Sequence, residues 1–209
     1  MKANQMDLRG AAYNQVRKFK LSLIRGIWTF IIRIRLRLIN VAFQKPIAFY
    51  GNSYFVRHRF SKITIGKKCA FLSTSYANLA GINKKNVIST EENAEIIIGD
   101  RCGFSGVVIL ATNKITIGEN VLVGANSFIS DFGFHELDPE KRWNGKIESD
   151  ISDPVEIKDN VWLGMNVTVL KGITIGENSV IGANSVVTKD IPANVIAVGN
   201  PCKVVRNIK

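Results

Sequence analysis

The chain contains two histidines, whose side chains can exchange protons near neutral pH. A neutral imidazole, with an ordinary pKa of about 6.5, can take a proton from a hydroxyl group and later return it. His135 lies in an acidic segment, SDFGFHELDPEKR. His58 lies in VRHRF, where its basic neighbours favour a structural role. The sequence therefore favours His135 as a general base.

A carboxylate that accepts a hydrogen bond from the imidazole would fix its tautomer. Asp131, four residues before His135, is the first candidate for this role, and Glu148 is the second. The chain has no glycine-rich phosphate loop of the GxGxxG or GxxxxGK type, so nucleotide-dependent transfer is not indicated.

The cysteines Cys69, Cys102 and Cys202 are odd in number and lack the spacing of metal ligands. They predict neither a disulfide framework nor a zinc site, and they fit a reducing cytoplasm. A zinc site of the carbonic anhydrase type needs three histidines, and pooling two histidines across a subunit interface supplies too few kinds of ligand. We therefore expect no metal.

The positive charge is concentrated at one end of the chain. Residues 1–62 contain 13 Lys or Arg and one acidic residue, a net charge of 13 − 1 = +12, and the other 147 residues have a net charge of 15 − 16 = −1. A nucleic-acid-binding surface on the main domain is therefore not expected.

The apolar stretch 21–43 is interrupted by arginines, and nothing before it resembles a signal peptide. Each central Arg opposes membrane insertion by about 2.5–3.5 kcal/mol, so the segment is not expected to span a bilayer. It either lies on an anionic membrane surface or packs on the domain or in an oligomer interface, and the sequence leaves both open.

From residue 157 onward, an aliphatic side chain recurs every six residues: Ile157, Leu163, Val169, Ile175, Ile181 and Val187. The same register appears earlier at Ile117, Val123 and Ile129. A period of six matches neither a helix nor a simple alternating strand. It predicts an all-β parallel β-helix in which each coil has three short flat strands, with Gly and Asn at the corners.

The register is interrupted between Ile129 and Ile157, where a loop at about residues 131–154 leaves the repeats. Long insertions in repeat folds are usually functional. We therefore divide the chain into a basic, helical N-terminal segment at 1–46, a β-helix domain at 47–200 with this extruded catalytic loop, and a tail at 201–209.

The repeats ITIGEN-VLVGAN and VWLGMN-VTVLKG-ITIGEN-SVIGAN resemble those of the hexapeptide-repeat acyltransferases, over about residues 63–206. The segment HELDPEKR is similar to the HPxDPxxR segment of maltose-type and polysaccharide-type O-acetyltransferases, whose histidine is the catalytic base. Glu136 stands where proline usually follows that histidine. The resemblance implies a left-handed β-helix, a homotrimer, acetyl-CoA as co-substrate and His135 as the base.

The resemblance also implies where acetyl-CoA binds. Trp162 matches a tryptophan beside the thioester or acceptor, and Gly164 and Met165 match the corner whose backbone N–H faces the thioester carbonyl. The remaining matches line the pantetheine channel or contact the phosphates of coenzyme A: Ala183, Thr188, Lys189, Lys203 and Arg206.

The resemblance implies an O-acetyltransferase that acts on a sugar hydroxyl in polysaccharide, lipopolysaccharide or capsule biosynthesis. The basic N-terminus would bring this cytoplasmic enzyme to a glycolipid acceptor at the inner face of the membrane. An amino-sugar N-acetyltransferase or a serine-type acetyltransferase would share the same motifs. A non-catalytic scaffold or membrane-binding module is the alternative of another class.

Overall fold

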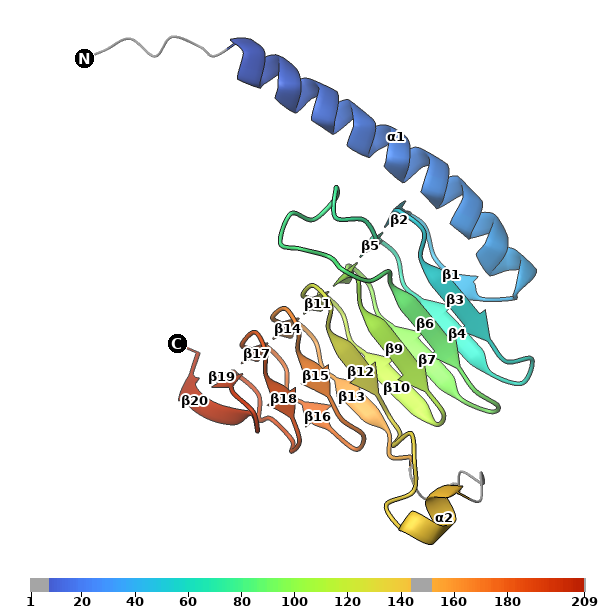
Figure 1. Cartoon of the computed structure of the whole chain (residues 1–209), viewed down its shortest axis with the longest axis vertical. Helices are drawn as coiled ribbons and strands as arrows, with labels where there is room; N and C mark the ends of the chain where they lie inside the picture. Colours follow the sequence, from blue (N-terminus) through green and yellow to red (C-terminus); the bar gives the residue numbers. More distant parts are fainter. Residues whose placement is uncertain (1–7, 144–151, 209) are drawn as a thin grey trace.

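The computed structural model describes residues 8–143 and 152–208, and it confirms the predicted left-handed parallel β-helix (Figure 1). The chain winds through three flat sheets in turn. Sheet A contains β1 (Ala42–Phe43), β4 (Lys62–Ile65), β7 (Glu95–Ile98), β10 (Lys114–Ile117), β13 (Val155–Ile157) and β16 (Thr174–Ile175). Sheet B contains β2 (Ile47–Tyr50), β5 (Cys69–Leu72), β8 (Gly103–Ser105), β11 (Leu122–Val123), β14 (Trp162–Leu163), β17 (Val180–Ile181), β19 (Val195–Val198) and β20 (Lys203–Asn207). Sheet C contains β3 (Tyr54–Arg57), β6 (Val87–Thr90), β9 (Val108–Ala111), β12 (Phe128–Ser130), β15 (Thr168–Val169) and β18 (Val186–Val187).

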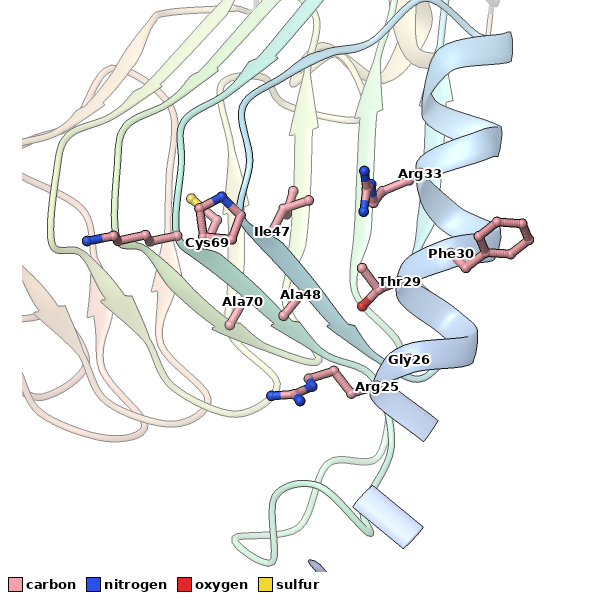
Figure 2. Close-up of a pocket in the computed structure, with 11 residues that line it drawn as sticks. Arg25, Gly26, Thr29, Phe30, Arg33, Ile47, Ala48, Cys69 and Ala70 are labelled. Carbon is pink, nitrogen blue, oxygen red and sulfur yellow. The ribbon is translucent and has the colours of Figure 1, made fainter. Parts of the chain in front are cut away.

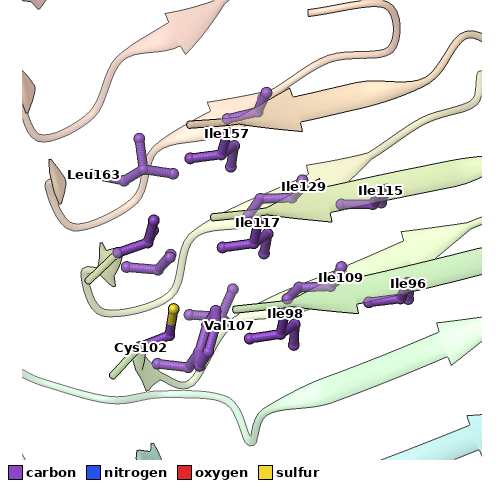
Figure 3. Close-up of a cluster of buried hydrophobic side chains, with 14 of the residues drawn as sticks. Ile96, Ile98, Cys102, Val107, Ile109, Ile115, Ile117, Ile129, Ile157 and Leu163 are labelled. Carbon is purple, nitrogen blue, oxygen red and sulfur yellow. The ribbon is translucent and has the colours of Figure 1, made fainter. Parts of the chain in front are cut away.

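The repeated aliphatic residues form the core of the prism. Ile98, Ile117 and Ile157 occupy equivalent positions in successive strands of sheet A, and all three are buried (Figure 3). In the first coils, aromatic rings take the place of aliphatic residues in sheet B. Phe71 stacks on Phe49 at 5.1 Å and on Phe104 at 5.0 Å between ring centroids. Each coil therefore buries its neighbour's side chains along one continuous axis.

Asparagine side chains connect the corners of successive coils. Asn160, for example, donates to Asn178 at 2.9 Å and accepts from Asn120 at 2.9 Å. All three residues have positive φ, a conformation that Asn tolerates better than most residues. The sequence pattern of Gly and Asn therefore marks the turns between the sheets.

An ion-pair ladder crosses the outer face of sheet A. Glu95 lies between Lys62 and Lys114, with N–O distances of 3.1 Å to each. Hydrogen bonds from Lys114 and then Lys62 lower the pKa of the Glu95 carboxyl below its ordinary value. The ionised carboxylate therefore stabilises the fold.

Helix α1 (Leu8–Leu38) lies across the N-terminal end of the prism (Figure 1). Its residues Ile32 and Leu36 are buried against the first coil, and the Thr29 hydroxyl accepts a hydrogen bond from the Phe49 amide at 3.0 Å. The helix thus covers the otherwise open end of the β-helix. None of the described helices is long and apolar enough to cross a membrane.

The opposite face of α1 carries an exposed apolar stripe, which we call the outer stripe. Its members recur every three or four residues and therefore lie on one side of the helix. They are Tyr13, Val16, Phe19, Leu23, Ile27, Phe30, Ile34 and Leu38.

The structure changes both domain boundaries that the sequence suggested. The first coil begins with β1, inside segment 1–46, because β1 pairs with β4. Part of the predicted tail also belongs to the prism, because β20 (Lys203–Asn207) adds an antiparallel strand to β19 in sheet B. The cysteines Cys69, Cys102 and Cys202 are free and buried.

Candidate active site

The loop that carries His135 leaves the prism between β12 and β13, at the edge where sheet C meets sheet A, which we call the C–A edge (Figure 1). A backbone bridge between Phe132 and Ser152 joins its two ends. The Asp153 amide also donates to the Asp131 carbonyl at 2.8 Å. These two contacts hold the ends of the loop together, and we call this part of the loop, residues 131–132 and 152–153, the neck.

Asp131 is fully buried in this neck. Its carboxylate accepts hydrogen bonds from the Thr112 amide at 2.8 Å and the Asn113 amide at 2.9 Å. These amides lie between β9 and β10 in the preceding coil, where the step from Leu110 to Ile117 is seven residues instead of six and makes a one-residue bulge. Burial raises the pKa of the Asp131 carboxyl, although the hydrogen bonds from Thr112 and Asn113 oppose that shift.

The residues on both sides of His135 are held in place. The Phe134 ring packs against Phe132 at 4.7 Å and Phe128 at 6.0 Å between centroids. On the other side, the Arg142 guanidinium donates to the carbonyls of Glu136 at 2.9 Å and Leu137 at 2.8 Å.

A short helix follows, α2 (Pro139–Trp143), which Asp138 caps by accepting a hydrogen bond from the Glu140 amide at 2.8 Å. These contacts fix the backbone of the motif HELDPEKR, while the imidazole of His135 stays exposed.

The structure does not bring Asp131 and His135 into contact. The Asp131 oxygens bond to the bulge, and no hydrogen bond joins them to the imidazole in the described part of the chain. The second candidate, Glu148, lies outside the described residues.

The corner after β14 lies at the opposite edge of sheet C, where sheets B and C meet, which we call the B–C edge. Trp162 is 54% exposed on the outer face of sheet B. A Cβ atom at Gly164 would lie 2.6 Å from the Ala183 backbone nitrogen, so only glycine lets these two coils stack. The Gly164 amide donates to Ile181 in the ladder, whereas no backbone hydrogen bond among the described residues uses the Met165 amide. The Met165 N–H is thus available to an acceptor.

The residues that the resemblance assigns to the site fall into two groups within one chain. Trp162, Gly164, Met165 and Ala183 lie on sheet B or at the B–C edge, and Lys203 and Arg206 lie on β20 of sheet B. By contrast, Thr188 and Lys189 follow β18 and lie at the C–A edge, as do Asp131 and His135.

The width of sheet C separates the two edges. Five residues, 166–170, cross this sheet in the coil of Met165. At about 3.3 Å per residue they span roughly 16 Å. One chain therefore does not place the imidazole beside the Met165 amide.

A second loop, residues 74–85 between β5 and β6, also lies at the B–C edge. Asn126 anchors it: its side chain donates to the Gly81 carbonyl at 2.8 Å and accepts from the Asn83 amide at 3.0 Å. Sequence reasoning missed this anchor because Asn126 looks like every other corner asparagine. The loop is therefore tied to the corner at Asn126, which neighbours the corner of Met165 in the next coil.

Within residues 8–143 and 152–208, no three His, Cys, Asp or Glu side chains gather closely enough to hold a metal ion.

Two family models match the repeats. The bacterial transferase hexapeptide model, with six repeats, matches residues 154–189, and the hexapeptide repeat of succinyl-transferase matches residues 114–135. The chain belongs to the hexapeptide-repeat transferase family. This family membership agrees with the corner glycines and the six-residue core observed in the fold.

Two relatives of this hexapeptide-repeat transferase are galactoside O-acetyltransferases. The protein from Escherichia coli is 51% identical over 102 residues, which cover 49% of this chain and 48% of that protein. The protein from Lactococcus lactis is 40% identical over 144 residues, which cover 69% and 62%. The chain thus spans about half the length of the Escherichia coli relative.

A solved structure of AntD, an N-acyltransferase from Bacillus cereus, in complex with a dTDP-sugar and coenzyme A, shares the fold. The TM-score is 0.61, with 14% identity over 85% of this chain and 89% of that chain.

Proposed function

We propose that the protein is an acetyl-CoA-dependent O-acetyltransferase that acetylates a sugar hydroxyl, with His135 as the general base. The observation that carries this proposal is the braced loop, which holds an exposed imidazole outside the prism through contacts on both sides of it. The similarity to two galactoside O-acetyltransferases supports a sugar acceptor.

The proposed reaction uses few groups. The His135 imidazole removes the proton of the sugar hydroxyl as its oxygen attacks the thioester carbonyl carbon. The Met165 N–H donates to the developing oxyanion. When the C–S bond breaks, the imidazolium returns its proton to the thiolate of coenzyme A, so that acetyl sugar and free thiol leave.

The residues at the B–C edge suit the binding of acetyl-CoA. The stacked corners at Gly164 and Ala183 leave no side chain between the coils, so an extended pantetheine arm can approach the backbone. Lys203 and Arg206 are exposed on β20 and supply cations for phosphates. Thr188 and Lys189 would complete the binding site from the C–A edge.

We propose that the working unit is a homotrimer in which each site lies between two copies. The C–A edge of one chain would meet the B–C edge of the next, which brings His135 across to Met165. A cyclic trimer repeats such a contact three times and closes. In this assignment Asp131 is a positioning residue, which fixes the neck of the loop through the bulge at Thr112 and Asn113.

Hybrid trimers test this arrangement. His135→Ala removes the base, and Ala183→Trp blocks the other edge with a bulky side chain at an exposed position. Each variant alone is expected to be inactive. In a refolded equal mixture about one quarter of sites (one half times one half) combine an intact loop with an intact corner, so about a quarter of the activity should return. A mixture of intact trimers that stays inactive contradicts the shared site.

The acceptor that we propose is a sugar in polysaccharide, lipopolysaccharide or capsule precursors, at the cytoplasmic face of the membrane. The outer stripe of α1, with its flanking arginines, is the part of the chain that would contact that membrane. A panel of sugar alcohols and amino sugars, scored by release of free thiol, separates O- from N-transfer. If free thiol is released only with amino sugars, the proposed O-acetylation would be replaced by N-acetylation.

A further inference from the structure

A cleft of roughly 530 Å³ lies between α1 and the first strands of sheet B, far along the prism from Met165. Its floor is apolar and consists of Pro46, Ile47, Ala48 and Ala70. Figure 2 shows Arg25, Thr29 and Arg33 on the side of α1 that faces β2 and β5. The cleft therefore joins an apolar floor to a cationic wall.

Three cations line this cleft: Arg25, Arg33 and Lys68. No ion pair or hydrogen bond formed by these three side chains occurs among the described residues, and α1 contains no acidic residue. The Nε atom of Arg33 is buried and has no hydrogen-bond partner. The guanidinium of Arg33 is therefore not held by an acceptor among the described residues, and an anion in the cleft would meet no competing partner there.

The cleft continues onto the outer stripe of α1. A shallow groove on the helix is lined by Phe19, Leu23, Ile27 and Phe30, and it shares Gly26 and Phe30 with the cleft. A Cβ atom at Gly26 would meet nothing within 4 Å, so packing does not require glycine there. Glycine inside a helix destabilises it by about 1 kcal/mol relative to alanine. Its effect at this position is an open notch between the cationic cleft and the apolar groove.

We propose that this cleft binds the phosphate head of an anionic lipid, whose hydrocarbon chain passes the Gly26 notch and lies along the outer stripe. The guanidinium groups of Arg25 and Arg33 contact the phosphate, and the stripe enters the bilayer surface. This site deepens the proposed membrane contact and rests on it.

The positive charge of α1 argues against a second copy of the chain as the occupant of the cleft and the outer stripe. Helix α1 carries no acidic residue and eight basic ones, which are Arg9, Arg17, Lys18, Lys20, Arg25, Arg33, Arg35 and Arg37. Two copies of this helix therefore repel each other. An anionic bilayer attracts the same helix. A soluble phosphate would leave the apolar floor and the groove unused.

The test is sedimentation of the full-length protein with phosphatidylcholine vesicles that contain either phosphatidic acid or phosphatidylserine. Wild-type protein should prefer phosphatidic acid, whose phosphate monoester is accessible. Arg25→Gln with Arg33→Gln should weaken that binding by at least about tenfold more than Lys18→Gln with Lys20→Gln, which removes equal charge from the exposed part of the helix. If both double variants lose vesicle binding to the same extent, binding reflects only the net charge of the helix. That result would overturn the proposed site.

Gly26→Leu is a second test variant, and it should not unfold α1 because leucine has a higher helix propensity than glycine. Filling the notch should abolish the preference for phosphatidic acid while binding to phosphatidylcholine stays equal or rises, because leucine adds apolar surface. A preference that survives in this variant contradicts the path that we propose. Inorganic phosphate that binds as tightly as the lipid also overturns it. Acetyl transfer to a soluble sugar is measured separately, so failure of the catalytic proposal is distinguishable from failure of this one.

Discussion

Replacing Asp131 by alanine distinguishes a residue that fixes the loop from one that acts on the imidazole. The substitution leaves the Thr112 and Asn113 amides buried without partners. Each such amide is unfavourable by about 1–3 kcal/mol, which gives about 2–6 kcal/mol for both. Removal of a buried carboxylate, whose own burial is unfavourable, offsets part of that, so we expect a loss of about 2–3 kcal/mol in the free energy of unfolding.

Urea unfolding of the two proteins measures this loss, and the pH dependence of kcat/KM tests the function. Because burial raises the pKa of Asp131, its carboxyl contributes most stability below its unfolded pKa of about 3.9, and this contribution falls as pH rises through the raised pKa. The wild-type advantage should therefore shrink over that range. We expect kcat/KM to fall without a change in the shape of its pH profile. Unchanged stability together with a displaced pH profile would refute the structural assignment and restore Asp131 as the partner of His135.

Three further substitutions test other parts of the account. Gly164→Ala should lower the free energy of unfolding by about 1–3 kcal/mol, read as a lower Tm, because the new Cβ presses on the backbone of the next coil; Gly133→Ala, where nothing lies closer than 3.9 Å, should change Tm little. Arg142→Gln should lower kcat by about tenfold with little change in Tm, since it releases the backbone after His135; a fall in Tm that accounts for the whole loss of activity would argue against that role. Glu95→Gln should reduce stability at neutral pH by up to about 1 kcal/mol, and the difference should disappear as pH falls through the lowered pKa of Glu95; a difference that persists in acid would show that the ion pairs are not its cause.

The later coils were predictable because their core positions are uniformly aliphatic and their corners carry Gly and Asn. The first two coils were not, since Phe49 and Phe71 replace the aliphatic residues and stack as rings inside the prism. Their corners also lack the repeated GxN pattern, so the sequence pattern places β1 in the N-terminal segment 1–46. A period is visible in a sequence only where the same kind of side chain serves the same position.

The candidate site was predictable in part. His135 stands out by residue type and by its place in an extruded loop. The hydrogen-bond partners of Asp131 could not be predicted in this way. The Thr112 and Asn113 amides come from the preceding coil, 19 and 18 residues earlier, and reach the carboxylate only because of the bulge there. The division of the site between two edges of the prism also follows only from the order of the sheets, which the spacing of motifs does not show.

The most direct measurement is the release of free thiol from acetyl-CoA with a sugar acceptor, for the wild type, His135→Ala and His58→Ala. His58 is the matched control, since it is the other histidine in the chain and lies on the N-terminal coils, where its ring contacts Phe60. We expect His135→Ala to lose about 10²–10⁴-fold in kcat/KM with its assembly intact, and His58→Ala to keep its activity. Full activity in His135→Ala would contradict the proposed mechanism.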